Sequence, residues 1–95
     1  MTIGALVVKL RIHGCASLKQ KRAHIRPIMD RVRHKFHVAV AEVDLQDVYD
    51  MAQLAFVTVS SSDKIANSTL DKILDFVESL GLAELADQEM ELIRY

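Results

Sequence analysis

The first residues of the chain alternate between two kinds of position with the two-residue period of a β-strand. Over residues 2–13 one side of the predicted strand is wholly apolar, and the other side is apolar for half of its length. The first side consists of Leu6, Val8, Leu10 and Ile12. The second side consists of Ile3, Ala5, Val7, Lys9 and Arg11. We therefore expect a strand with one face in the core and a partly apolar second face.

After a short loop at residues 13–16, the pattern takes on the period of an α-helix, from Leu18 to about Lys35. Apolar residues recur at steps of three, four and seven, which places them on one helix face. They are Leu18, Ile25, Ile28, Met29, Val32 and Phe36. Ser17 is a suitable N-cap, because its hydroxyl can accept a hydrogen bond from a free amide of the first turn. Pro27 is expected to bend the helix, with two shorter helices as the alternative.

The rest of the chain predicts two more strands, a second helix and a last strand. The strands are expected at residues 38–43, 54–59 and about 89–94, with a polar connection or one helical turn at 44–51. The second helix starts after Ser61–Asp63, ends at Gly81 and buries Ala66, Leu70, Ile73, Leu74, Val77 and Leu80. Right-handed crossovers in the order β-α-β-β-α-β place both helices on one face of a four-stranded antiparallel sheet. We expect one α+β domain, residues 1–95, with the ferredoxin-like fold.

Composition adds limits on the class of protein. About half of the 95 residues are apolar (51%) and 26% are charged, so the chain should fold unaided. A single cysteine, Cys15, excludes an internal disulfide, and no Cys/His cluster has zinc spacing. There is no signal sequence and no apolar run long enough to cross a membrane. We expect a soluble cytoplasmic protein without a metal or another cofactor.

Charge is divided very unevenly along the chain. Residues 1–37 contain nine Lys/Arg, all four histidines and one acid, whereas residues 38–95 contain three Lys/Arg and twelve acids. A net charge near zero therefore conceals a basic face that could bind a polyanion. On the first helix we expect phosphate contacts from Lys19, Lys21, Arg22, Arg26 and Arg33. Lys21 lies closest to the apolar stripe, so its ammonium must reach solvent or find an anion.

The most specific motif of the chain is Ser17-Leu18-Lys19-Gln20-Lys21-Arg22, preceded by Ile12-His13-Gly14 and followed by residues 36–43, Gln46-Asp47 and residues 70–78. In these stretches the chain resembles the YlxP-like family of small bacterial proteins. Tyr49 stands where the family pattern has Trp. The resemblance covers essentially the whole chain. It implies a ferredoxin-like fold and a gene near translation initiation and ribosome-maturation genes, and it implies no established activity.

Other chemistry has weaker support in the sequence. Cys15 near a helix start could be a nucleophile, but no base partner is indicated, so an ordinary reduced thiol is the simpler interpretation. The acidic group Glu42, Asp44, Asp47 and Asp50 lacks the spacing and the glycine of an EF-hand loop, which favours a solvated turn. The phenylalanines are not interleaved with the cations of the first helix, so we expect contact with phosphates and no base stacking.

These observations predict a non-enzymatic accessory protein that binds RNA or a ribosomal subunit through its first helix. The alternative is a dimeric small-ligand sensor resembling ACT domains, which share the strand and helix order but need a glycine-rich first loop. Only Gly14 is present at that position here. The second face of the first strand, with Ile3, Ala5 and Val7, also predicts a homodimer, because an apolar patch of that kind is unusual on a monomer.

Overall fold

A computed structural model describes residues 1–95 and confirms the predicted order of elements. The strands are β1 (Thr2–Arg11), β2 (Ala39–Asp44), β3 (Met51–Ser60) and β4 (Glu84–Arg94), and the helices are α1 (Leu18–Phe36) and α2 (Asp63–Leu80). The strands form one sheet in the order β2-β3-β1-β4, and every neighbouring pair is antiparallel. The fold is therefore the ferredoxin-like sandwich that the sequence predicted. Neither helix has the length and apolar character needed to span a membrane.

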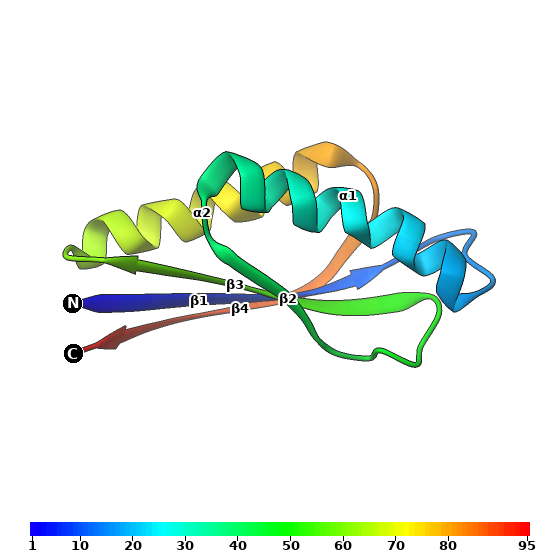
Figure 1. Cartoon of the computed structure of the whole chain (residues 1–95), viewed down its shortest axis with the longest axis horizontal. Coiled ribbons are helices and arrows are strands. Elements are labelled where there is room, and N and C mark those ends of the chain that lie inside the picture. The colour runs from blue at the N-terminus through cyan, green and yellow to red at the C-terminus, as the bar shows by residue number, and fades with distance from the viewer.

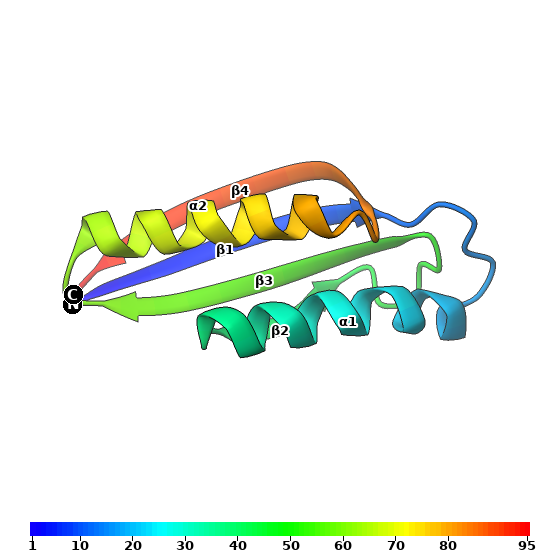
Figure 2. The same cartoon turned by 90° about the horizontal axis from the view of Figure 1, so that it is seen from above.

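Both helices lie on the same face of the sheet, with α1 over β2 and α2 over β1, β3 and β4 (Figures 1 and 2). The core lies between these two layers. The four side chains predicted to form the core side of the first strand are at most 1% exposed: Leu6, Val8, Leu10 and Ile12. From the helices, Ile25, Ile28 and Val32 meet Leu70, Ile73 and Val77 in the same cluster. The prediction of the buried faces is thus confirmed.

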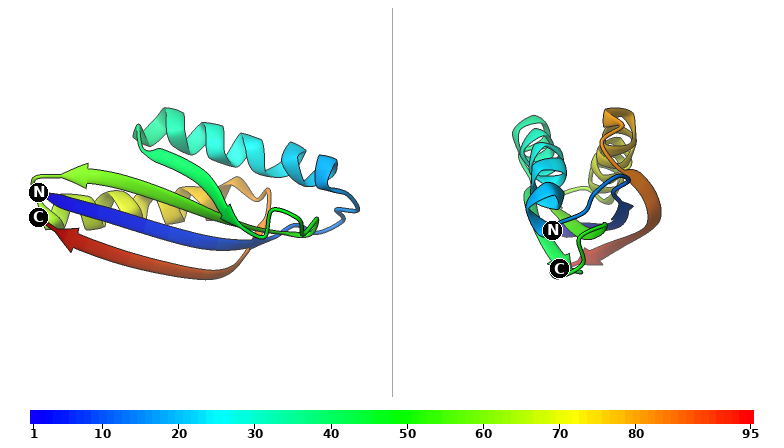
Figure 3. Two further views of the ribbon diagram at one scale, coloured as in Figure 1. Left: turned by 60° about the horizontal axis from the view of Figure 1, so that its bottom comes forward. Right: turned by 90° about the vertical axis from the view of Figure 1, so that its right-hand side faces the viewer.

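The opposite face of the sheet is not covered by any element of the chain (Figure 3). We call it the open face, and strand register defines its residues. Its apolar members are Ile3, Ala5, Val7, Ala39, Ala41, Met51, Ala55, Val57, Val59 and Ile93. Its charged members on β1 and β4 are Lys9, Arg11, Asp87, Glu89 and Glu91. Val59 is 63% exposed and Ile93 is 40% exposed, so part of this apolar surface faces solvent.

Two strands begin earlier than the hydrophobic pattern predicted. β3 starts at Met51 and β4 starts at Glu84. Both residues pair with Arg11, the last residue of β1, which lies between these two strands. The first five residues of β4 are mostly polar and contain a β-bulge opposite Lys9 and Leu10, so they do not show a clean alternation. Pairing with the long strand β1 extends both neighbours beyond their apolar segments. The connection before β3 contains a turn in which Leu45 has a φ of 64°, and it contains no helical turn.

Helix α1 continues through Pro27 as one element, so the alternative of two shorter helices is wrong. Proline removes a single amide donor, and the buried residues on either side of it, Ile25 and Ile28, hold both halves against the same core. The helix ends one residue later than predicted, where His37 adopts φ 54° and its amide donates to the carbonyl of Arg33 at 3.0 Å. Helix α2 ends at Gly81, as predicted, with φ 64°.

The two chain ends are joined at one end of the sheet (Figure 1). The ammonium of Met1 donates to the carbonyl of Tyr95 at 2.7 Å, and the amide of Tyr95 donates to the carbonyl of Met1 at 2.8 Å. Beside them, the carboxylate of Asp63 accepts hydrogen bonds from the hydroxyl of Thr2 and from the guanidinium of Arg94. The Thr2 hydroxyl, followed by Arg94, holds the pKa of Asp63 below its ordinary value of 3.8.

We expect Ile73→Ala to lower the free energy of unfolding by about 2–5 kcal/mol, because it leaves a cavity in the core. The matched control is Ile65→Ala in the same helix, where the side chain is 59% exposed against 0% for Ile73. This control should change the unfolding free energy by about 0.5 kcal/mol or less. Urea denaturation of both variants measures the difference, and equal midpoints would show that the core face has been misassigned.

We also expect Asp63→Asn to change how stability depends on pH. A carboxyl whose pKa is lowered by folding stabilises the folded state at pH values above its unfolded pKa of 3.8. That contribution is lost as the pH falls through the lower, folded pKa. The variant should therefore unfold more easily than wild type at pH 7, and the difference should disappear at strongly acidic pH. Parallel thermal melts from pH 7 to acid test this, and a difference that does not vary with pH would contradict it.

Candidate nucleic-acid interface

The start of α1 is fixed by a reciprocal pair of capping hydrogen bonds. The hydroxyl of Ser17 accepts from the amide of Gln20 at 3.1 Å, and the side-chain carbonyl of Gln20 accepts from the amide of Ala16 at 2.7 Å. This is a variant of the capping box, in which Gln20 bonds the amide of the residue before the N-cap, and it satisfies two free amides at the helix start. No acidic residue lies in that turn. The basic residues that follow are therefore presented from a well-defined helix.

Lys21 does not belong to the exposed basic surface, and the prediction that it contacts phosphate is wrong. The residue is 1% exposed. Its ammonium lies 2.9 Å from Oε2 of Glu42 and donates to the carbonyls of Leu45 at 2.9 Å and of Gln46 and Met51 at 3.3 Å each. The anion that the sequence required for this lysine is thus supplied by β2.

The contact between Lys21 and Glu42 is an ion pair. The ammonium protons are directed at the three carbonyl oxygens, and Oε2 of Glu42 is buried without an aligned hydrogen bond. A buried charge without compensation would be costly, so each partner requires the other. The Glu42 side chain is 20% exposed to solvent, so its second oxygen can remain in contact with water. This pair therefore serves the fold.

The other four predicted phosphate contacts are exposed on the flank of α1 next to β2. Lys19, Arg22 and Arg26 take part in none of the four ion pairs of the structure. Arg33 is different, because its guanidinium lies 2.9 Å from Asp30 and also donates to the carbonyl of Val40 at 3.3 Å. Three free cations therefore remain in this row, and a fourth is partly engaged with β2.

The flank of α1 that faces α2 contains a cation beside aromatic rings, which sequence reasoning missed. The Lys35 ammonium lies 4.6 Å from the ring centroid of Phe76 and 5.8 Å from that of Phe36. The two rings meet edge to face, with centroids 5.6 Å apart. The phenylalanines are 40 residues apart in the sequence, so only the packing of α1 against α2 brings them to one cation. Both rings are half-buried and serve mainly as helix-to-helix contacts.

The loop before α1 leads to a hollow of about 470 Å³ with His13 and His24 in its lining. Nε2 of His13 lies 2.7 Å from the carboxylate of Glu84, and Nδ1 of His24 faces the carbonyl of Gln20 at 2.9 Å. The nearby thiol of Cys15 is 8% exposed and donates to the carbonyl of Ser17 at 3.4 Å. This hydrogen bond is to a backbone carbonyl and not to a side chain that could act as a general base.

The acidic residues around the β2–β3 connection are used locally. Glu42 faces Lys21, and the carboxylate of Asp44 accepts from the amide of Leu45 at 2.7 Å. Nowhere do three His, Cys, Asp or Glu side chains come together in a way that could hold a metal ion. The positions of these carboxylates are explained by the turn that they stabilise.

The fold and the free basic flank of α1 define a small ferredoxin-like α+β protein. The chain belongs to the family described as a protein of unknown function, DUF503, whose model matches residues 3–90. It is 34% identical over 77 residues to the uncharacterized protein YlxP of Bacillus subtilis, a match that covers 81% of this chain and 84% of YlxP. The predicted family membership is therefore confirmed.

Solved structures show the same fold at low sequence identity. A de novo designed protein with a ferredoxin fold, LFR1 1, has a TM-score of 0.55 and 10% identity, and the match covers 98% of this chain and 83% of that one. An antibiotic biosynthesis monooxygenase has a TM-score of 0.54 and 10% identity, with 100% and 98% of the two chains covered. At such identities these likenesses define the fold alone.

We expect Lys21→Met to lower the free energy of unfolding by about 3 kcal/mol, near the low end for breaking a buried ion pair, because it leaves Glu42 without its partner. The matched control, Lys19→Met in the same helix, should have an effect of about 0.5 kcal/mol or less. Adding Glu42→Leu to Lys21→Met should recover part of the loss. Chemical denaturation of the three variants tests this, and equal stability of the two single variants would refute it.

Proposed function

We propose that this protein is a non-enzymatic cytoplasmic accessory protein that binds RNA, free or within a ribosomal subunit, and works as a homodimer. Binding takes place along the flank of α1 that carries Lys19, Arg22 and Arg26, with Arg33 at its far end. The contacts are made to phosphates of the RNA backbone.

The observation that carries this proposal is the row of free cations on a rigid helix. Lys19, Arg22 and Arg26 are three and four residues apart, so they project on one side over about 10 Å of helix axis. None of them has a carboxylate partner within the chain. Free cations in a row can displace the counterions of a phosphate backbone, which is the main source of affinity in nucleic-acid binding.

The distribution of acids supports the same orientation. The exposed acids of α2, Asp71, Asp75 and Glu78, lie on the other helix, away from the β2 side of α1. A polyanion would therefore be repelled from the α2 side. The expected setting of the family among translation genes agrees with an RNA partner.

Recognition along this flank would be of shape and phosphate. The aromatic pair Phe36 and Phe76 lies on the opposite flank of α1, and no aromatic side chain stands among Lys19, Arg22 and Arg26 to stack on a base. We therefore expect weak sequence preference and strong dependence on salt.

The test is binding of a mixed-sequence single-stranded RNA, and of isolated ribosomal subunits, across a salt series. The double variant Arg22→Gln/Arg26→Gln should bind more weakly, with a log–log salt slope reduced by about 1.4, at roughly 0.7 for each phosphate contact on a single strand. The matched control is Lys64→Gln/Lys72→Gln on α2, which removes the same charge and should keep the wild-type slope.

Three results would count against the proposal. Absence of wild-type binding to both RNA and subunits would reject it, and equal loss in the two double variants would show that only net charge matters. Absence of RNA affinity combined with a thermal shift on adding a metabolite would favour the ACT-like sensor instead.

A further inference from the structure

The open face of the sheet is an apolar surface of the size that a stable interface uses. It spans four strands and the ten residues of β1. At about 4.8 Å between strands and 3.4 Å per residue, its flat extent is up to about 650 Å². A standard interface buries about 800 Å² of accessible surface per partner, and accessible area exceeds the flat extent of a corrugated sheet. Covering this face with one partner is therefore sufficient for a specific complex.

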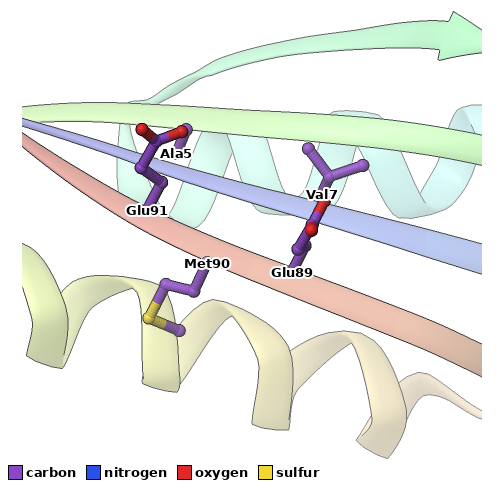
Figure 4. A pocket seen from close by; sticks show the side chains of 5 residues that line it. All are labelled: Ala5, Val7, Glu89, Met90 and Glu91. Carbon is purple, nitrogen blue, oxygen red and sulfur yellow. The ribbon is translucent and has the colours of Figure 1, made fainter.

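The charges on this face are free and of both signs. Lys9 and Arg11 at the end of β1, and Asp87, Glu89 and Glu91 on β4, take part in none of the ion pairs of the chain. Figure 4 shows Glu89 beside Val7 and Glu91 beside Ala5, while Met90 between them points to the helix side. An apolar surface with free acids at one border and free bases at one end is complementary in charge to a copy of itself.

Lys9 and Glu89 are neighbours of opposite charge on the open face, and Asp87 lies beside them in the same hollow. Lys9 pairs with Asp87 across the sheet and Glu89 pairs with Val7, so Lys9 and Glu89 are diagonal neighbours. They line one hollow of about 150 Å³ together with Val7 and Gln53. The relevant two-fold axis lies in the plane of the interface, passes midway between Lys9 and Glu89 and is perpendicular to the line that joins them. A two-fold rotation about it exchanges the positions of the two residues. Lys9 of each copy then meets Glu89 of the other.

The same axis agrees with how sheets pack. The line from Lys9 to Glu89 runs diagonally from β1 to β4, so the axis perpendicular to it is oblique to the strands. Rotation about an oblique axis turns the strands of the second copy, which therefore cross those of the first at a steep angle. Steep crossings are one of the two preferred arrangements of stacked sheets. The neighbouring hollow of about 270 Å³, lined by Ala5, Val7, Glu89, Met90 and Glu91, adjoins the axis and can receive apolar side chains of the second copy.

Other occupants fit this face less well. RNA would meet three carboxylates on β4 and would find no aromatic ring on β1, β2, β3 or β4 of the open face to stack on. A single helix would leave much of a four-stranded surface uncovered. A second copy has a surface of matching extent and supplies both signs of charge.

We propose that two copies of this chain pack their open faces together about a two-fold axis, with Lys9 of each copy paired to Glu89 of the other. This deepens the homodimer of the proposed function by naming its contacts. It is independent of RNA binding, because α1 lies on the opposite face of the sheet (Figure 3).

The experiment is a charge exchange followed by analytical ultracentrifugation over a micromolar concentration series. Lys9→Glu and Glu89→Lys should each weaken dimerisation by at least about tenfold, because each places like charges together. The double variant Lys9→Glu/Glu89→Lys should restore it. Lys64→Glu on the helix side, with the same charge change as Lys9→Glu, should dimerise like wild type. Thermal melts check that all variants are folded.

Each further outcome decides the proposal. A wild-type protein that stays monomeric at high micromolar concentration overturns it, as does a wild-type dimer that neither single variant weakens. Single variants that weaken the dimer without rescue by the double variant overturn the Lys9–Glu89 pairing. RNA binding measured on the same variants separates the two proposals, since monomeric variants that keep their RNA affinity would leave the function standing.

Discussion

The structure depends on one buried ammonium. Lys21 extends from the apolar face of α1 into the space between the helix, β2 and the β2–β3 connection, where Glu42 and three carbonyls surround it. Because an uncompensated charge there would be costly, the helix, the edge strand and the turn must take up one arrangement together. The left-handed backbone of Leu45 belongs to this arrangement, since it directs its carbonyl to the ammonium at 2.9 Å.

This constraint divides the cations of α1 into groups with different tasks. Lys21 connects α1 to β2, Arg33 reinforces that contact through Val40, and Lys35 lies over the aromatic pair between the helices. Lys19, Arg22 and Arg26 have no internal partner. A surplus of basic residues is thus partly structural, and the part left over is what makes an interface with a polyanion physically reasonable.

Strand β1 has a similar double use. Its even-numbered side chains form the centre of the core, while Ile3, Ala5 and Val7 lie on the face that no helix covers. Packing is close at Gly4 on the core side, where a Cβ would lie 3.0 Å from Cδ1 of Leu70. The strand is therefore tightly packed on one side and open on the other, so the sheet separates the helix layer from an uncovered face.

The sequence by itself determined the order of elements and the buried faces, because hydrophobic periodicity and capping residues act over short distances along the chain. Its resemblance to the family motifs indicated the family. Only the tertiary structure decided which cations are free. The position of Lys21 near the apolar stripe predicted that it needs an anion, but Glu42 is 21 residues away and its approach depends on how α1 packs on β2. The same holds for Lys35 with Phe76 and for the polar start of β4, whose extent is set by its pairing with β1. Partners that are far apart in the sequence leave no local pattern, so packing alone reveals them.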